Sequence, residues 1–219
     1  MKELIIPKIE SAEVPRSLTE LTAMLNAVEA APVAVDSVNW DAFPYAPVVS
    51  VRIAHTGKAI LLLWRVSEQY LRAKAEIDNG PVWDDSCVEF FLRPDQCSPY
   101  YYNVECNCAG TLLIGRGTHN RDRVTADDEV MATALRFPTV APRVFDTREA
   151  YEEWMMGLYI PVSALFADEI DSLDGRVMTG NFYKCGDALP KPHFLSWNPI
   201  DLPRPYFHCP EFFGLFRFA

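Results

Sequence analysis

Hydrophobic and polar residues alternate along most of this chain, and a period of two is typical of half-buried β-strands. Val49, Val51 and Ile53 alternate with small or polar residues, whereas 59–66 is continuously apolar and of strand length. Thr56-Gly57 and Ala109-Gly110 have the composition of hairpin turns. Strands are therefore expected at 49–53, 59–66, 88–92, 102–106, 111–114, 132–137, 152–160, 178–185, 193–197 and 212–218.

Helical signals are confined to short stretches. Residues 17–30 have the pattern of one helix, with Ser17 as N-cap and Glu20 completing a capping box. Pro161 opens a single helical turn at 161–166. No strand–helix alternation and no composition break is present, which disfavours a parallel sheet and a second domain. The sequence predicts an all-β protein, an antiparallel β-sandwich with a short N-terminal helix. It forms one domain over 1–219, on which residues 1–30 pack as an extension.

Composition narrows the class of protein. Of 219 residues, 49% are hydrophobic, which supplies a sizeable core, yet no apolar run reaches the length of about 18 residues that spans a bilayer. The net charge of −10 and the lack of a Lys/Arg cluster argue against nucleic acid as a partner. The lack of a membrane-length apolar run excludes membrane insertion. The sequence leaves open whether the chain forms a homo-oligomer.

The N-terminus and the cysteines bear on the compartment. Residues 1–7 lack the apolar stretch of a secretory signal, so a cytoplasmic location is expected for the chain as numbered, and secretion if it is a processed form. The six cysteines are expected to be mostly free, buried thiols, because a chain of this length needs no disulfide framework.

Catalytic motifs are not found in the sequence. There is no G-x-S-x-G element, and Gly115-Arg116-Gly117 is interpreted as a turn. Cys106-Asn107-Cys108 has the wrong spacing for zinc. The acidic clusters Asp84-Asp85 and 127–129 are candidate calcium ligands, although such clusters usually lie in solvated loops without a metal ion.

Two further classes of site stay open. Methionine and histidine could ligate haem in a sandwich, although Met155 and Met156 lie in the middle of a strand, where packing is favoured. A pair of carboxyl groups across a cleft would make a glycoside-processing enzyme. The sequence alone does not pair its many acidic residues across loops.

Segment 83–92, with Trp83, an acidic pair, Ser86 and Glu89 entering an apolar strand, resembles the central signature of the family 9 carbohydrate-binding modules. Four further segments are similar to that family in order and spacing: 101–107, 180–185, 193–199 and 207–214. The resemblance spans roughly residues 33–219. It implies a jelly-roll-like antiparallel sandwich, often with structural calcium, that binds the ends of plant polysaccharides or small sugars.

The resemblance also implies a site. In the family, two tryptophans hold the sugar while carboxylate, guanidinium and amide groups bind its hydroxyls, which agrees with the apolar face and polar rim of a pyranose ring. The positions that match or could serve are Trp83, Glu89, Trp197, Asn181, Arg116 and Asn103, whereas Trp40, Trp64 and Trp154 are expected in the core. A non-catalytic carbohydrate-binding domain is the leading expectation. Haem binding, glycoside processing and a purely structural or protein-interaction role are the alternatives.

Overall fold

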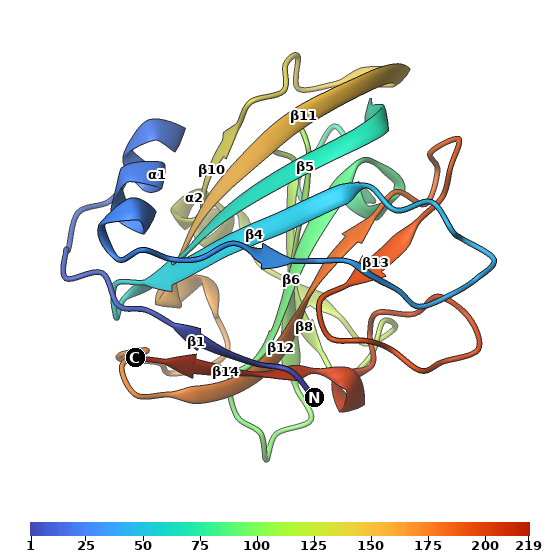
Figure 1. Ribbon diagram of the computed structural model, residues 1–219. Helices are drawn as coiled ribbons and strands as arrows, with labels where there is room; N and C mark the ends of the chain where they lie inside the picture. Colours follow the sequence, from blue (N-terminus) through green and yellow to red (C-terminus); the bar gives the residue numbers. More distant parts are fainter.

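Two β-sheets pack face to face in this protein (Figure 1), as seen in a computed structural model that describes residues 1–219. The large sheet has the order β1 (Glu3–Ile6), β14 (Gly214–Phe218), β12 (Val177–Cys185), β6 (Cys87–Arg93), β7 (Tyr101–Asn107), β8 (Leu112–Gly117) and β9 (Val124–Thr125), with β13 (Phe194–Ser196) and β3 (Ser37–Val38) beside β12. The small sheet has the order β10 (Leu135–Pro138), β11 (Phe145–Pro161), β5 (Ala59–Ala73), β4 (Val48–His55) and β2 (Val33–Ala34).

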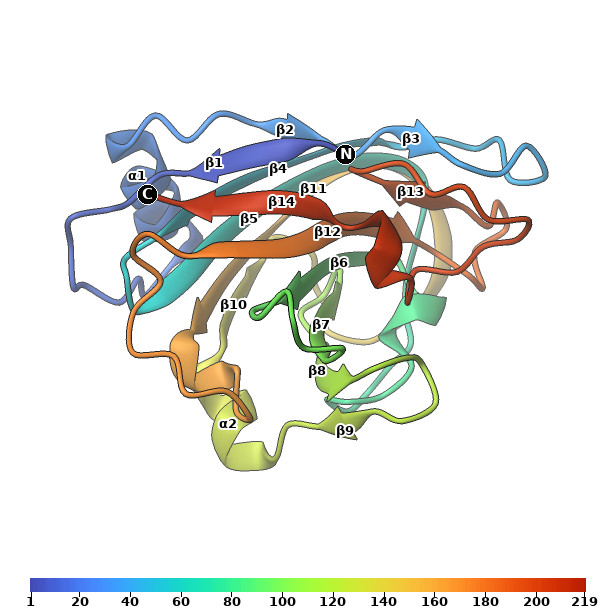
Figure 2. The same cartoon turned by 90° about the horizontal axis from the view of Figure 1, so that it is seen from below.

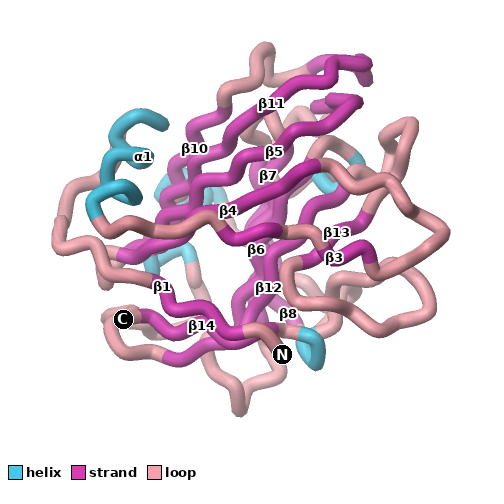
Figure 3. Tube along the Cα trace, viewed as in Figure 1, coloured by secondary structure: helices cyan, strands magenta, loops and turns pink.

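Neighbouring strands are antiparallel except β1 and β14, which run parallel. The strands of the large sheet can be followed from β1 to β9 in Figure 2. Helices are few (Figure 3): α1 (Leu18–Ala27), α2 (Asp128–Thr133) and the single turns η1 (Val82–Asp84), η2 (Val162–Ala164) and η3 (Pro210–Phe212). None of the helices is long and apolar enough to cross a bilayer.

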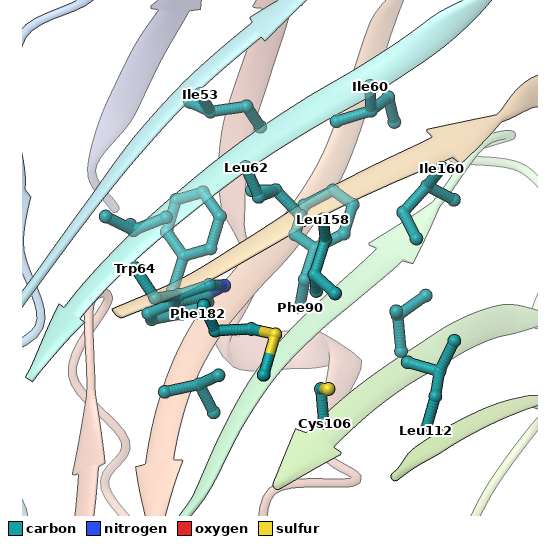
Figure 4. Close-up of a cluster of buried hydrophobic side chains, with 14 of the residues drawn as sticks. Ile53, Ile60, Leu62, Trp64, Phe90, Cys106, Leu112, Leu158, Ile160 and Phe182 are labelled. Carbon is teal, nitrogen blue, oxygen red and sulfur yellow. The ribbon is translucent and has the colours of Figure 1, made fainter. Parts of the chain in front are cut away.

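The main core lies between the two sheets (Figure 4). Alternate side chains of each strand point inward, so Phe90 and Phe182 of the large sheet meet Leu62, Trp64 and Leu158 of the small one. Aromatic side chains of the two sheets are in contact: the rings of Trp64 and Phe182 pack edge to face with centroids 5.7 Å apart.

Each sheet is also covered on its outer face. Helix α1 lays Leu21 and Leu25 against Leu61 and Leu63 of the small sheet. The outer face of the large sheet is covered by the β13–β14 connection (residues 197–213), whose Phe207 stacks on Tyr183 of β12 with ring centroids 4.1 Å apart. This second covered face carries most of the polar chemistry described below.

The predicted fold class is confirmed, and so is the helix after Ser17. The Ser17 hydroxyl accepts a hydrogen bond from the Glu20 amide at 3.2 Å, while the Glu20 carboxylate accepts from the Arg16 amide. All six cysteines are free, and only Cys97 is exposed.

Two sequence-based expectations need correction. The strand expected at 132–137 is wrong in its first half, because Asp127 caps helix α2 by accepting from the Val130 amide, and the strand begins only at Leu135. The first residues also do more than pack on the sandwich. Residues 3–6 form β1, an edge strand of the large sheet that places Ile6 in the core.

Candidate functional site

A cavity of about 500 Å³ lies on the outer face of the large sheet. Strands β6, β7, β8 and β12 form its floor, while η1, the β8–β9 loop and the β13–β14 connection supply its walls. The floor side chains are the outward-pointing members of strands whose alternate residues fill the core. The cavity therefore owes its position to the same period-two pattern that builds the sandwich.

Two carboxyl groups lie side by side on this floor. Glu89 of β6 is the Cα partner of Glu105 of β7, and each side chain is buried. Burial raises the pKa of Glu105 to about 7. The pKa of Glu89 is raised well above its usual value, first by burial and then by the charge of Glu105. Asp187, in the wall, has its pKa raised to about 6, mainly by burial.

A buried guanidinium faces these acids. Arg123, from the β8–β9 loop, donates through Nη2 to the Asn103 side chain, to the Tyr101 carbonyl at 3.0 Å and to the Gly115 carbonyl at 2.9 Å. Asn103 in turn donates to Glu105 Oε1 at 2.7 Å. A side chain at position 115 would place its Cβ 2.7 Å from Asn103 Oδ1, so glycine is needed there for the network to form.

Part of this polar set has no protein partner. Glu105 Oε2, Arg123 Nε and Arg123 Nη1 are buried atoms without a hydrogen bond. Leaving such atoms unpaired is costly, and more so for charged groups. A ligand with both donors and acceptors would satisfy them.

Aromatic side chains form the walls. Trp83, in η1, is 40% exposed, and its carbonyl accepts from the Asp187 amide at 3.1 Å, which fixes η1 beside the end of β12. Tyr206 stands half-buried on the β13–β14 connection. His208 bonds to the Tyr101 hydroxyl at 2.9 Å and holds that connection over the floor. The cavity thus combines flat apolar surfaces with a charged floor.

The family model described as carbohydrate-binding family 9 matches residues 19–218. This chain belongs to carbohydrate-binding family 9. A candidate carbohydrate-binding protein from Bacteroides uniformis is 47% identical to this chain in sequence, and the two structures have a TM-score of 0.95. The match covers 100% of this chain and 99% of that one.

Two structures of a family 9 module from Caldicellulosiruptor kristjanssonii, in complex with glucose and with cellotriose, share its fold. Each is 13% identical and matches 100% of this chain, with TM-scores of 0.56 and 0.59 over 96% and 94% of those chains. Comparison with curated proteins gave no match.

Three of the residues expected at a family 9 site line the cavity: Trp83, Glu89 and Asn103. Trp83 precedes the strand, in an exposed turn, as its Gly-Pro context indicates. Glu89 and Asn103 lie on outward-facing positions of β6 and β7, opposite the apolar residues that alternate with them.

Trp197 does not reach the cavity. Its ring is 4% exposed, lies in the main core and stacks on Phe216 with centroids 5.3 Å apart. The expectation that it forms a second wall for a sugar is therefore wrong, because neither face of the ring is open. Its ring also packs edge to face on the Phe182 ring, with centroids 5.7 Å apart, on the inner side of the sheet.

Asn181 and Arg116 also serve other purposes. Asn181 is completely buried and bonds to the backbone of Asn198, so it anchors the β13–β14 connection rather than a ligand. Arg116 pairs with Asp168 at 3.1 Å and lies over the Tyr100 ring. Arg116 lies on the same side of β8 as Ile114, away from the cavity. The expectation that Asn181 and Arg116 bind a ligand at this site is therefore wrong.

The lining residues that sequence reasoning missed include Glu105, Arg123, Asp187 and Tyr206. Glu105 could have been found, since it shares the outward parity of Asn103 on one strand. The other three lie in loops, and no local pattern places a loop over a sheet face.

The acidic pairs considered for calcium have other contacts. Asp85 accepts from the amides of Lys74 and Ala75, from Arg72 Nε and from Asn107 Nδ2. Asp127 caps α2. These contacts occupy the Asp85 and Asp127 carboxylates with protein donors, and calcium at these places stays an untested expectation.

Proposed function

We propose that the outer-face cavity binds a single sugar unit or the end of a short sugar chain without catalysing its cleavage. The observation that carries the proposal is the set of unpartnered buried atoms, Glu105 Oε2 with Arg123 Nε and Nη1. A sugar hydroxyl donates to a carboxylate and accepts from a guanidinium at the same time. Neighbouring hydroxyls of one ring therefore match this arrangement, and charge-assisted hydrogen bonds of this kind are strong.

The walls suit the remaining surface of a sugar. The C–H face of a pyranose packs on an aromatic plane, and Trp83 and Tyr206 both line the cavity. A volume of about 500 Å³ is within the range of pockets that enclose small ligands. Since related modules were solved with glucose and cellotriose, gluco-configured sugars are the first candidates.

Binding is better supported than hydrolysis. A glycosidase places two carboxyl groups on either side of the scissile bond. Here Glu89 and Glu105 are direct neighbours across β6 and β7, on one floor. The methionines considered for haem, Met155 and Met156, lie on β11 of the small sheet, and neither lines the cavity.

Titration calorimetry with glucose and cellotriose tests the proposal. At pH 8, above the pKa of about 7 of Glu105, wild-type protein is expected to bind at least one of the two, and Glu105→Gln to bind it more weakly, because the buried acceptor loses its charge. Glu153→Gln, an exposed carboxylate on β11, is the matched control and should bind as wild type. Equal affinity in Glu105→Gln and wild type, or no heat with either sugar, would contradict the proposed function.

A further inference from the structure

Two cysteines and a carboxylate meet at one side of the cavity floor. Cys87 and Glu89 are two residues apart on β6 and share its outer face, while Cys185 on β12 is the Cα partner of Cys87. The two sulfur atoms and a Glu89 carboxylate oxygen all lie within 4.8 Å of one another. All three side chains are buried, so the grouping is a built feature of the sheet and not a surface coincidence.

The charge around this group is one-sided. Glu105 and Asp187 lie beside Glu89 and Cys185, and all four line the cavity. The nearest lysine, Lys184, points to the opposite face of β12, where it pairs with Glu68. In the wall, Nη2 is the only nitrogen of the Arg123 guanidinium that is hydrogen-bonded, and it donates to the Asn103 side chain and to two backbone carbonyls. No protein cation thus bonds to Glu89 or to either thiol.

The side chains already point toward a common centre. Cys185 Sγ donates to Glu89 Oε1 at 3.0 Å, which turns the thiol toward the carboxylate. A thiol buried among apolar groups keeps its proton while no cation is bound. Metal binding reverses that preference, because a coordinated thiol gives up its proton.

We propose that Cys87, Glu89 and Cys185 form a binding site for a borderline-soft divalent cation, with Zn²⁺ as the expected ion. Zn²⁺ takes thiolate and carboxylate ligands, whereas calcium and magnesium require an all-oxygen set. Two thiolates and one carboxylate carry three negative charges, of which the ion neutralises two. Binding one Zn²⁺ releases both thiol protons and any proton that Glu89 carries, and the affinity therefore rises with pH.

A fourth ligand can come from the cavity, because Glu89 and Cys185 both line it. Bond lengths near 2.3 Å to sulfur put two sulfur ligands of a tetrahedral ion about 3.8 Å apart. The two Sγ atoms lie within 4.8 Å of each other, which is close to that spacing. Water or Asp187 can complete the set, and the site does not depend on sugar binding.

Cobalt(II) titration of the reduced, chelator-treated protein, with no sugar present, tests the site. Thiolate-to-cobalt charge-transfer absorption is expected to saturate at one Co²⁺ per chain and to disappear when Zn²⁺ is added. Cys87→Ala and Cys185→Ala should each lower the affinity by at least about 100-fold, because each removes a direct ligand. Cys106→Ala is the matched control, since it removes a buried cysteine that lies on the inner face of β7.

A second readout uses the wild-type chain alone and is independent of how well the variants fold. After incubation with Zn²⁺ and dialysis, wild-type protein should retain one Zn²⁺ per chain by elemental analysis. Absence of a charge-transfer band, wild-type affinity in Cys87→Ala, or no retained Zn²⁺ would each overturn the metal site. None of these results bears on calorimetry with sugars, so the two proposals fail separately.

Discussion

The inner and outer faces of β6, β7 and β12 carry opposite chemistry although they belong to the same three strands. Inward-pointing residues such as Phe90, Val104 and Phe182 are apolar and fill the space between the sheets. Their neighbours Glu89 and Glu105 point outward and stay buried, and Glu105 Oε2 has no hydrogen-bond partner. Packing within the chain therefore accounts for most of the inner face, whereas the outer face holds the polar atoms that the proposed sugar would satisfy.

The inner face has one charged exception, which sharpens the contrast. Lys184 is fully buried there, 3.0 Å from Glu68 Oε2 and 2.8 Å from His193 Nε2, and Trp154 donates to the same glutamate at 2.8 Å. This group finds its partners inside the protein. On the outer face, Glu105 Oε2 and two of the three Arg123 nitrogens have no hydrogen-bond partner in the protein, and these are the atoms assigned to the proposed ligand.

The largest expected effect is on the inner face. Trp197→Ala should lower the free energy of unfolding by about 3–5 kcal/mol, because it removes a large ring from the packed core. Urea unfolding followed by circular dichroism measures the change. Trp83→Ala is the matched control and should change the stability by less than about 1 kcal/mol. A small loss for Trp197→Ala would contradict its placement in the core.

Lys184→Met should be the next most costly change, at about 3 kcal/mol, since it leaves the Glu68 carboxylate buried without its cation. Adding Glu68→Gln should restore part of the loss, as the remaining partner is then neutral. The double-mutant cycle in urea measures this coupling. If the two losses simply add, the buried pair does not act as described.

On the outer face, Arg123→Met should weaken sugar binding by at least about 30-fold, or about 2 kcal/mol, as expected when a central buried arginine is lost. Calorimetry with the sugar that wild type binds gives the value. Arg116→Met removes a guanidinium that pairs with Asp168 away from the cavity, and its affinity should stay at the wild-type value. Equal losses in the two variants would break the assignment.

The smallest effect concerns pH. Burial lowers the pKa of His208 to about 3, below the value of about 6.5 for an unfolded chain. Between these values the unfolded state binds the extra proton, so this residue lowers the stability as the pH falls below about 6.5. The difference in unfolding free energy between pH 7 and pH 5.5 should shift by about 1.3 kcal/mol in His208→Gln. An unchanged difference would mean that His208 is protonated in the folded state.

The parts of the fold that follow from the sequence are those set by neighbouring residues. Alternation in 88–92 fixes both the strand and the outward direction of Glu89, and the turn before it exposes Trp83. The same rule could have corrected two expectations. Leu195 and Trp197 are two positions apart, as are Ile114 and Arg116, so the members of each pair point to the same face of the sheet. The Trp197 and Arg116 side chains therefore lie on the side of their apolar partners, away from the cavity.

The rest of the site depends on distant contacts. Arg123 reaches Asn103 only because its loop folds back across β8, where Gly115 leaves room. Tyr206 and His208 reach the floor through a connection held by Asn181 and by the Tyr183–Phe207 stack. No local periodicity encodes these approaches, which result from packing between segments far apart in the chain.

The indole N–H resonances of the five tryptophans test the central claim most directly. A ¹H–¹⁵N spectrum recorded during titration with glucose or cellotriose, with Trp83→Ala and Trp197→Phe used for assignment, follows each ring separately. A sugar bound in the outer-face cavity should shift the Trp83 signal and leave the Trp197 signal in place. A shift of Trp197 with no change at Trp83 would contradict the account.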